Sequence, residues 1–172
     1  LNVICVDNDK QKIENLKRGI VPIYEPELDV LVNKNYGAGR LEFTSDIQYG
    51  VENSEVIFIA VGTPAEEDGS ADLQYVMAVA QDIAKYMNSY KVIVNKSTVP
   101  VGTGQIVKRV IEENRAASYP FDVVSNPEFL REGAAVYDFM HPDRVVVGAE
   151  SERAFEIMKS VYRVLFLNRD FF

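Results

Sequence analysis

The fold is decided by residues 92–111, which read VIVNKSTVPVGTGQIVKRVI. The stretch opens with the apolar, β-branched run Val92–Val94, which is the pattern of a strand buried on both faces. A polar loop follows, and then residues 106–111 place Ile and Val at the spacing of an amphipathic helix. Strands alternating with helices in this way form crossover units on a parallel sheet, so the stretch predicts an α/β protein.

The rest of the chain repeats this alternation. We expect further strands at Val3–Val6, Val56–Val61, Val123–Val124 and Val145–Val147, with a short strand at Glu42–Thr44. Helical periodicity covers residues 73–87 and 155–165, and a shorter helix is expected over Asp9–Arg18, ended by Gly19. Pro26 fits the first turn of another helix, which is expected to turn Leu28, Leu31 and Val32 inward. Together these predict a doubly wound, mostly parallel sheet.

Composition excludes several classes of protein. The chain has 172 residues, of which 47% are apolar, a formal net charge of −8 and one Cys. It is too apolar for disorder, and one Cys cannot make a disulfide framework or a Cys-based zinc site. The acidic balance argues against nucleic-acid binding, and no apolar run approaches the ~20 residues that span a bilayer. No secretory leader opens the chain, so we expect a soluble, cytoplasmic domain.

Ligands of open parallel sheets bind beyond the carboxyl ends of the strands. Five loops are therefore candidates for the functional site. They are residues 7–9, 62–64, 96–100 and 125–128, and the turn at Gly148.

Asp7 ends the first expected strand, where an acidic residue can hold the ribose hydroxyls of NAD. The alternative is that Asp7 or Asp9 only caps the helix that follows. The glycine fingerprint that would decide between them is absent from the chain, since Gly102-Thr103-Gly104 is an isolated pair of glycines.

Two further loops carry hydroxyl groups. Gly62 and Thr63 follow a strand and can approach a ligand closely, although Gly-Thr-Pro is more often a turn. Ser97 and Thr98, with Lys96 beside them, can hold an anion or order a water at a helix start. The alternative makes Thr103 an N-cap and Ser97 a turn residue.

Residues 126–133 read NPEFLREG and place Arg131 between two carboxylates. If the stretch is helical, Glu128 and Glu132 share one face, and one of them can act as general base. The alternative is a solvated helix start. The single His, His141, reads as a turn residue, and Cys5 reads as a core residue of its strand.

Taken in order, five motifs resemble the nucleotide-sugar dehydrogenases of the UDP-glucose/GDP-mannose dehydrogenase family. After the VDNDK sequence at residues 6–10 they read PIYEPEL (22–28), VGTP (61–64), KSTVPVGTG (96–104), NPEFLREG (126–133) and PDRVVVG (142–148). Members acting on UDP-glucose resemble the chain most. Members acting on GDP-mannose differ more in residues 97–104, and those acting on UDP-N-acetylmannosamine differ after residue 128.

The resemblance implies a two-step, NAD-dependent oxidation of UDP-glucose to UDP-glucuronate, through an aldehyde and a Cys thioester, without a metal. It assigns Asp7 to the adenosine ribose, with Lys12 near it. The implied cofactor contacts are Val61, Gly62, Thr63, Pro64, Ala65, Ser97, Thr98, Val99 and Glu132. Thr98 would also order the catalytic water, and Glu128 would be the general base. The implied sugar contacts are Glu128, Phe129, Leu130, Arg131 and Glu132.

The resemblance also implies that residues 1–172 are an incomplete NAD-binding domain. We expect a Rossmann-type sheet that lacks its first strand and Gly-rich loop, with the nucleophilic Cys, a catalytic Lys and the sugar-binding domains downstream of Phe172. The chain alone should then be inactive, and the full-length protein a homo-oligomer. The alternatives are a relative specific for GDP-mannose or UDP-N-acetylmannosamine, a β-hydroxyacid-type dehydrogenase, or a non-catalytic nucleotide-binding or dimerisation module.

Overall fold

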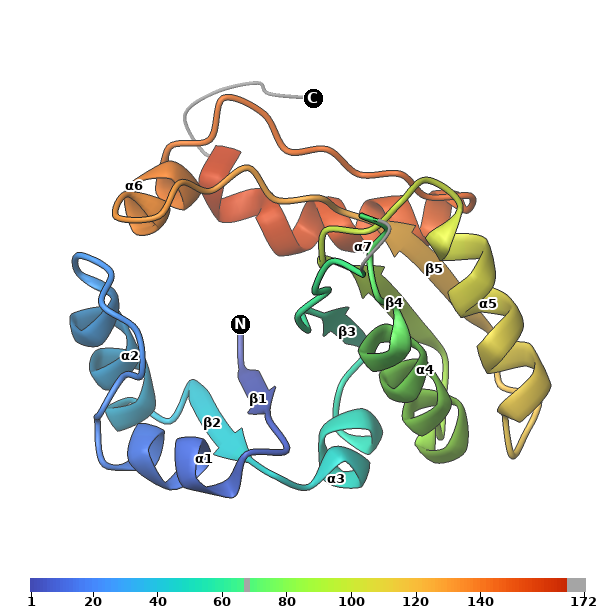
Figure 1. The fold of residues 1–172 in the computed structure, drawn as a ribbon, viewed down its shortest axis with the longest axis horizontal. Coiled ribbons are helices and arrows are strands. Elements are labelled where there is room, and N and C mark those ends of the chain that lie inside the picture. The colour runs from blue at the N-terminus through green and yellow to red at the C-terminus, as the bar shows by residue number, and fades with distance from the viewer. Residues whose placement is uncertain (67–68, 167–172) are drawn as a thin grey trace.

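The structure is a computed structural model that describes residues 1–66 and 69–166. Parallel strands alternate with helices along this part of the chain (Figure 1). The strands are β1 (Val3–Val6), β2 (Leu41–Thr44), β3 (Val56–Ile59), β4 (Lys91–Asn95) and β5 (Phe121–Ser125). The helices are α1 (Lys10–Lys17), α2 (Leu28–Gly37), α3 (Ile47–Glu52), α4 (Gln74–Tyr86), α5 (Thr103–Asn114), α6 (Ala135–Met140) and α7 (Glu152–Tyr162), with the 3₁₀ turn η1 (Arg163–Phe166). The predicted α/β class is confirmed.

The strands form two sheets. β1 pairs with β2, and β4 lies between β3 and β5, with every pairing parallel. Within the described residues, β1 and β3 each pair along one edge, and they are not hydrogen-bonded to one another. The predicted doubly wound arrangement is therefore present as two parallel sheets.

The three-stranded sheet is covered on both faces. All five residues of β4 are buried. Ile93 faces the core formed with α4 and α5, whereas Val92 and Val94 face α7 and pack in one cluster with Met158. Successive strand residues point to opposite faces, so an unbroken apolar run suits a strand with a helix layer on each side.

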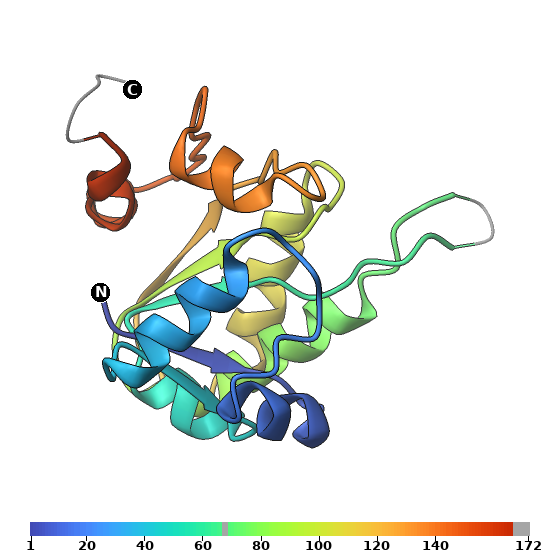
Figure 2. The ribbon, with the colours of Figure 1, turned by 90° about the vertical axis from the view of Figure 1, so that its left-hand side faces the viewer.

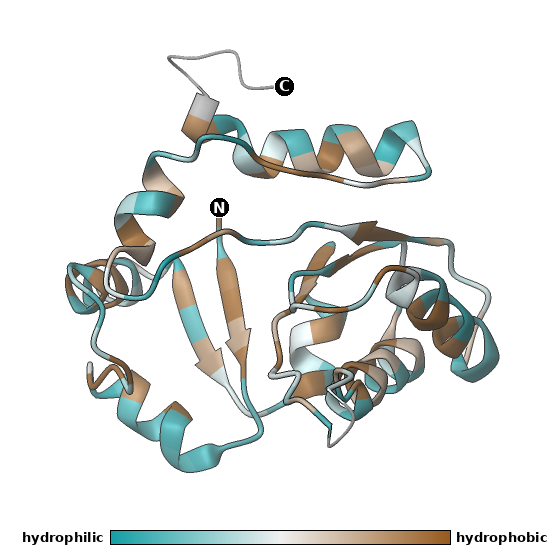
Figure 3. Cartoon of the chain, turned by 45° about the horizontal axis from the view of Figure 1, so that its top comes forward, coloured by the Kyte–Doolittle hydropathy of each residue, from teal (hydrophilic) through white to brown (hydrophobic). Residues whose placement is uncertain are grey.

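The two-stranded sheet is covered less. Ile13 of α1 and Phe43 of β2 are buried, but Val3 is 47% exposed although β1 is as apolar as β4 (Figure 3). Cys5, predicted to be a core residue, is exposed. That prediction was wrong because an apolar run reports what a strand could bury, not whether a neighbour covers it.

The termini of α1 follow from local chemistry. The Asp9 carboxylate accepts a hydrogen bond from the Lys12 amide as N-cap, and Gly19 beyond the helix adopts φ +80°. The predicted helix at Asp9–Arg18 is confirmed.

The helix α2 differs from its prediction. Pro26 precedes the helix, because the N-cap is Glu27, and no residue of α2 is buried. Leu28 and Val32 are partly buried but Leu31 is 37% exposed, so the expected inward stripe is formed only in part. Glu27 itself has φ +67°, a left-handed conformation that is strained for a residue with a Cβ.

The predicted strand at Val145–Val147 is absent. Only Gly148 pairs, in a single antiparallel bridge to Ser125, while Val145 and Val147 pack against the α7 cluster. The run therefore forms no strand, and it is partly buried at Val145 and Val147 while Val146 is 41% exposed. None of the helices in the described ranges is long and apolar enough to cross a membrane.

Candidate functional site

The candidate site lies at the carboxyl ends of β1, β3, β4 and β5. In Figure 2 the arrow of β1 runs to the right, and that of β5 runs upward. All of the loops that the sequence nominated as ligand-binding segments, apart from Gly148, begin directly after these strands. This is the edge at which open parallel sheets bind ligands.

Asp7 follows β1 and is held from two sides. Its Oδ1 accepts from the Asp9 amide at 2.9 Å, and its Oδ2 accepts from Lys12 Nζ at 2.6 Å. Partial desolvation favours protonation of Asp7, but the hydrogen bonds and the charge of Lys12 together outweigh it and lower the pKa of Asp7. Since Asp9 is the N-cap, the capping alternative holds for Asp9 and leaves Asp7 as an ionised acceptor at the site.

The loops after β3 and β4 are joined to each other. The Ser97 hydroxyl donates to the Val61 carbonyl at 2.8 Å, and the Thr63 hydroxyl donates to the Thr98 carbonyl at 2.8 Å. These bonds hold residues 61–63 beside residues 97–98, two segments that the resemblance assigns to the cofactor.

The Thr98 side chain is exposed, and its hydroxyl makes no hydrogen bond to any described residue. It is therefore available to a water or a ligand. Thr103 is not an N-cap: Gly102, at φ +92°, occupies that position, and the Thr103 hydroxyl donates to the Pro100 carbonyl at 2.8 Å.

Beyond Pro64 the β3–α4 loop projects from the body of the protein (Figure 2). Ala65 and Ala71 form an antiparallel bridge at its base, and the Asp72 amide donates to the Pro64 carbonyl at 2.8 Å. Ala65 thus lies where the loop leaves the site.

Residues 126–131 are not helical, so Glu128 and Glu132 do not share a helix face, and neither is at a solvated helix start. Glu128 Oε2 accepts from the Leu130 amide at 2.5 Å and turns the chain locally. Pro127 and the left-handed Gly133 also oppose a helix. Glu128 and Glu132 are both exposed, which leaves their carboxylates accessible to a ligand.

Arg131 does not bridge the two glutamates. Its guanidinium pairs with Asp138 of α6 through Nε at 3.0 Å and Nη2 at 2.7 Å, and the Arg131 amide also donates to that carboxylate. These hydrogen bonds lower the pKa of Asp138 to about 2. Arg131 therefore anchors the loop, while Phe129 and Leu130 remain exposed.

Lys96 is half-buried beside this loop. Burial lowers the pKa of Lys96, and the negative charge of Glu128 acts in the opposite direction.

Asn126 fixes the start of the loop, and although it lies in the candidate segment 125–128, no role was predicted for it. It is 1% exposed; its Nδ2 donates to the Val146 carbonyl at 2.8 Å, and its Oδ1 accepts from the Tyr162 hydroxyl. Both partners are distant in sequence, so only its place next to a strand end could have drawn attention to it. Because its amide is satisfied inside the protein, Asn126 positions Glu128 and does not meet a ligand itself.

Glu25 lies in the PIYEPEL motif at residues 22–28, although that motif assigned no role to it. Its carboxylate accepts from the Gly133 amide at 2.8 Å and from the Ala135 amide at 2.7 Å, across 108 and 110 residues of chain. The loop before α2 is thereby tied to the loop after β5.

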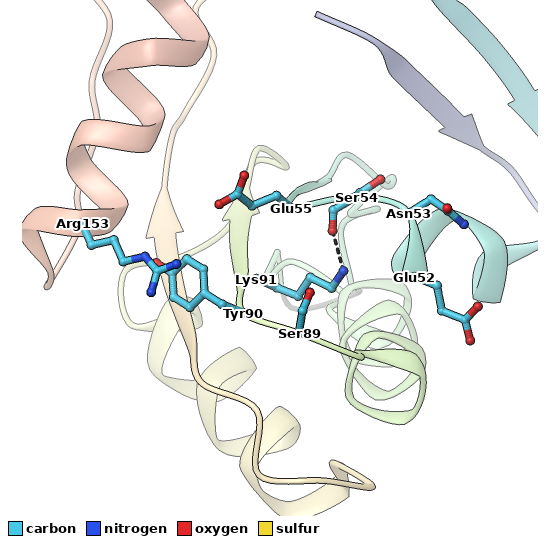
Figure 4. Close-up of a pocket in the computed structure, with 8 residues that line it drawn as sticks. All are labelled: Glu52, Asn53, Ser54, Glu55, Ser89, Tyr90, Lys91 and Arg153. Carbon is cyan, nitrogen blue, oxygen red and sulfur yellow. Dashed lines mark hydrogen bonds between the residues drawn. The ribbon is translucent and has the colours of Figure 1, made fainter.

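A polar pocket of about 380 Å³ lies at the opposite ends of β3 and β4 (Figure 4). Its buried Lys91 donates to the Ser54 carbonyl at 2.6 Å, and Arg153 stacks on the Tyr90 ring. Two carboxylates, Glu52 and Glu55, balance these two cations. Lys91 is hydrogen-bonded, the charges of the lining are balanced, and the pocket lies at the amino ends of β3 and β4, away from the candidate site.

Within the described ranges, no group of three or more His, Cys, Asp or Glu residues could hold a metal ion. Cys5 lies on β1, and His141 bonds and stacks with Tyr137 at the end of α6. The donors at the strand ends are instead carboxylates, hydroxyls and backbone groups. This set suits a nicotinamide dinucleotide. Carboxylates can accept hydrogen bonds from its ribose hydroxyls, and backbone groups can bond its carboxamide and phosphates.

Comparison with known proteins agrees with this chemistry. The family described as UDP-glucose/GDP-mannose dehydrogenase family, NAD binding domain, matches residues 1–166. UDP-glucose 6-dehydrogenase of Rhizobium meliloti is 54% identical over 98% of the chain, which covers 39% of that protein.

Two solved structures share the fold. A UDP-glucose dehydrogenase from Pyrobaculum islandicum superposes with a TM-score of 0.91 at 41% identity, over 95% of this chain and 39% of its own. A GDP-mannose dehydrogenase from Pseudomonas aeruginosa gives 0.90 at 34% identity, over 96% of this chain and 39% of its own. The chain thus spans about two fifths of the length of these relatives.

Proposed function

Since the chain belongs to the UDP-glucose/GDP-mannose dehydrogenase family and corresponds to its NAD-binding domain, we propose that the complete protein oxidises UDP-glucose to UDP-glucuronate. The observation that carries the choice of sugar is identity: 54% to a UDP-glucose enzyme against 34% to a GDP-mannose enzyme. The fold does not separate the two, since the two superpositions are nearly equal.

NAD fits the residues at the strand ends. We propose that Asp7 binds the ribose hydroxyls. Its pKa is lowered, and its carboxylate has further lone pairs that can accept hydrogen bonds besides those from Lys12 and the Asp9 amide. Residues 61–65 and 97–99, joined by the Ser97 and Thr63 hydroxyls, offer the surface along which the cofactor lies. When bound, NAD supplies the acceptor for the hydride that leaves the sugar carbon.

Glu128 is the proposed general base. One of its oxygens accepts from the Leu130 amide, which leaves the other free to take the proton of the C6 hydroxyl as hydride departs. The exposed Thr98 hydroxyl is assigned to the water that hydrolyses the thioester. Phe129, Leu130, Arg131 and Glu132 complete the proposed sugar side, with Glu132 also toward the nicotinamide.

We further propose that the chain is one part of a larger catalytic unit. Within the described residues β1 and β3 each have a single paired edge, which supports a first strand and Gly-rich loop contributed from outside residues 1–172. The nucleophilic Cys, the catalytic Lys and the sugar-binding domains are assigned to the remaining length of the relatives. We also propose that the complete protein is a homo-oligomer and lies in the cytoplasm.

The test is the stoichiometry of NADH formed by the complete protein. With UDP-glucose limiting, the proposal predicts two NADH per sugar, and much slower turnover of GDP-mannose and UDP-N-acetylmannosamine. One NADH per sugar, preference for another sugar nucleotide, or activity only on a hydroxyacid would reject it. Residues 1–172 alone should form no NADH.

A further inference from the structure

One side chain of the loop between α1 and α2, that of Glu25, contacts the loop that follows β5. Glu25 is half-buried, and each of its carboxylate oxygens accepts one backbone N–H, from Gly133 and from Ala135. Hydrogen bonds to an ionised acceptor are short and strong, and two of them from one carboxylate fix both the distance and the orientation of the segment that donates them.

The segment that Glu25 holds is otherwise lightly anchored on its outer side. Glu128, Phe129 and Glu132 are exposed, and Phe129 has 62% of its surface in solvent. The Arg131–Asp138 pair ties the middle of the segment to α6, but α6 follows the same segment and has no buried residue of its own. The Glu25 contact is what ties this local unit to the part of the chain that begins with β1.

We propose that Glu25 is a positioning residue for the oxidation, an inference that rests on the proposed function. It fixes the positions of Glu128 and Glu132 relative to Asp7 and Lys12, the pair assigned to the ribose. Lys12 belongs to α1, and the loop that carries Glu25 leaves the end of α1. Through this connection and the two Glu25 hydrogen bonds, the part of the chain with Asp7 sets where the general base lies relative to the cofactor, and a small misplacement of a base lowers the rate steeply.

The test compares Glu25→Gln and Glu25→Ala with Glu27→Gln in the complete protein. Glutamine keeps the size of the side chain but offers an NH₂ group, which cannot accept, to one of the two amides. Glu27 is exposed on the same loop and makes no side-chain hydrogen bond with described residues, so Glu27→Gln controls for the loss of a charge there.

Steady-state kinetics give the first readout. We expect kcat/KM for UDP-glucose to fall about tenfold in Glu25→Gln and further in Glu25→Ala, mainly through kcat. The affinity for NADH should stay within about twofold, because Glu132 is the one cofactor-assigned residue in the segment that Glu25 holds, and the others lie outside that segment. A purely structural role would lower both quantities together, and that result would overturn the proposal.

Amide hydrogen exchange gives a readout that does not depend on activity. The Gly133 and Ala135 amides should exchange at least about tenfold faster in Glu25→Gln than in the wild type, and unchanged in Glu27→Gln. Unchanged exchange, or faster exchange with kcat/KM intact, would refute the positioning role. A wild type that does not oxidise UDP-glucose would instead reject the proposed function, while exchange would still report whether Glu25 holds the segment.

Discussion

The two sheets of this domain differ in how completely they are covered. β4 is buried along its whole length between α4 and α5 on one face and α7 on the other, whereas β1 has three exposed residues out of four. Both strands are apolar runs in the sequence. Both core clusters are built on the three-stranded sheet, whereas both sheets supply residues to the candidate site.

The proposed chemistry is also divided between the two parts. The part with β1 and β2 provides Asp7 and Lys12, and the part with β3, β4 and β5 provides Thr98 and Glu128. Cofactor selection and proton transfer should therefore respond to different substitutions, and Glu25 is the residue through which one part acts on the other.

The largest expected effect is on the chemistry of the second part. Glu128→Gln removes the proposed base while keeping its shape, and kcat with UDP-glucose should fall about thousandfold. NADH affinity should be unchanged, and Glu113→Gln, an exposed position on α5, should leave kcat unaltered. Retention of more than a tenth of wild-type kcat in Glu128→Gln would remove Glu128 from the mechanism.

Substitutions in the helices of the two parts should lower the free energy of unfolding by different amounts. Ile111 of α5 is fully buried, and Ile111→Ala should cost about 3 kcal/mol of unfolding free energy, whereas Leu31→Ala on α2 should cost about 1 kcal/mol. Denaturant dependence of hydrogen exchange in β4 and β2 of the complete protein measures both. Equal costs would mean that α2 is packed by a segment outside the described residues.

Cofactor preference should respond only to the first part. Asp7→Ser removes the ribose acceptor and frees Lys12, so NAD affinity should fall about tenfold while NADP affinity rises. Asp9→Ser is the matched control, because serine also caps a helix and α1 should be preserved. Isothermal titration decides, and equal loss of both cofactors would contradict the assignment of Asp7 and Lys12.

The smallest expected effect is at the strained entry to α2. Glu27 holds φ +67°, and Glu27→Gly should stabilise the domain by about 1 kcal/mol, because the relief of strain exceeds the entropy that glycine adds to the unfolded chain. The same exchange experiment measures it, and a destabilised variant would show that the Glu27 conformation is not strained.

Local sequence predicted much of this fold. The run Val92–Val94 predicted a central strand, and the helical spacing of residues 73–87 predicted α4, because both signals come from burial on a known period. Val145–Val147 has the same apolar character but forms no strand, since Gly148 alone pairs with Ser125. The short helices α3 and α6 have too few residues for a period to be read.

The site was predictable where it lies next to a strand end. Asp7, Thr63 and Ser97 could be nominated from that position alone, and the structure places them there. The condition that residues 126–133 be helical is not met, because the Glu128 side chain accepts from the Leu130 amide and Gly133 is left-handed. Glu25 and Asn126 act through partners far along the chain, and no local pattern encodes such contacts.

The most direct measurement is a crystal structure of the complete protein with NAD and UDP-glucose bound. Our account predicts one NAD that spans both sheets, with its adenosine ribose on Asp7 and its nicotinamide end beside Glu132, and with the C6 hydroxyl of the sugar within hydrogen-bond reach of Glu128. A cofactor confined to one sheet, or bound at the Lys91 pocket, would contradict the division of the site between the two parts.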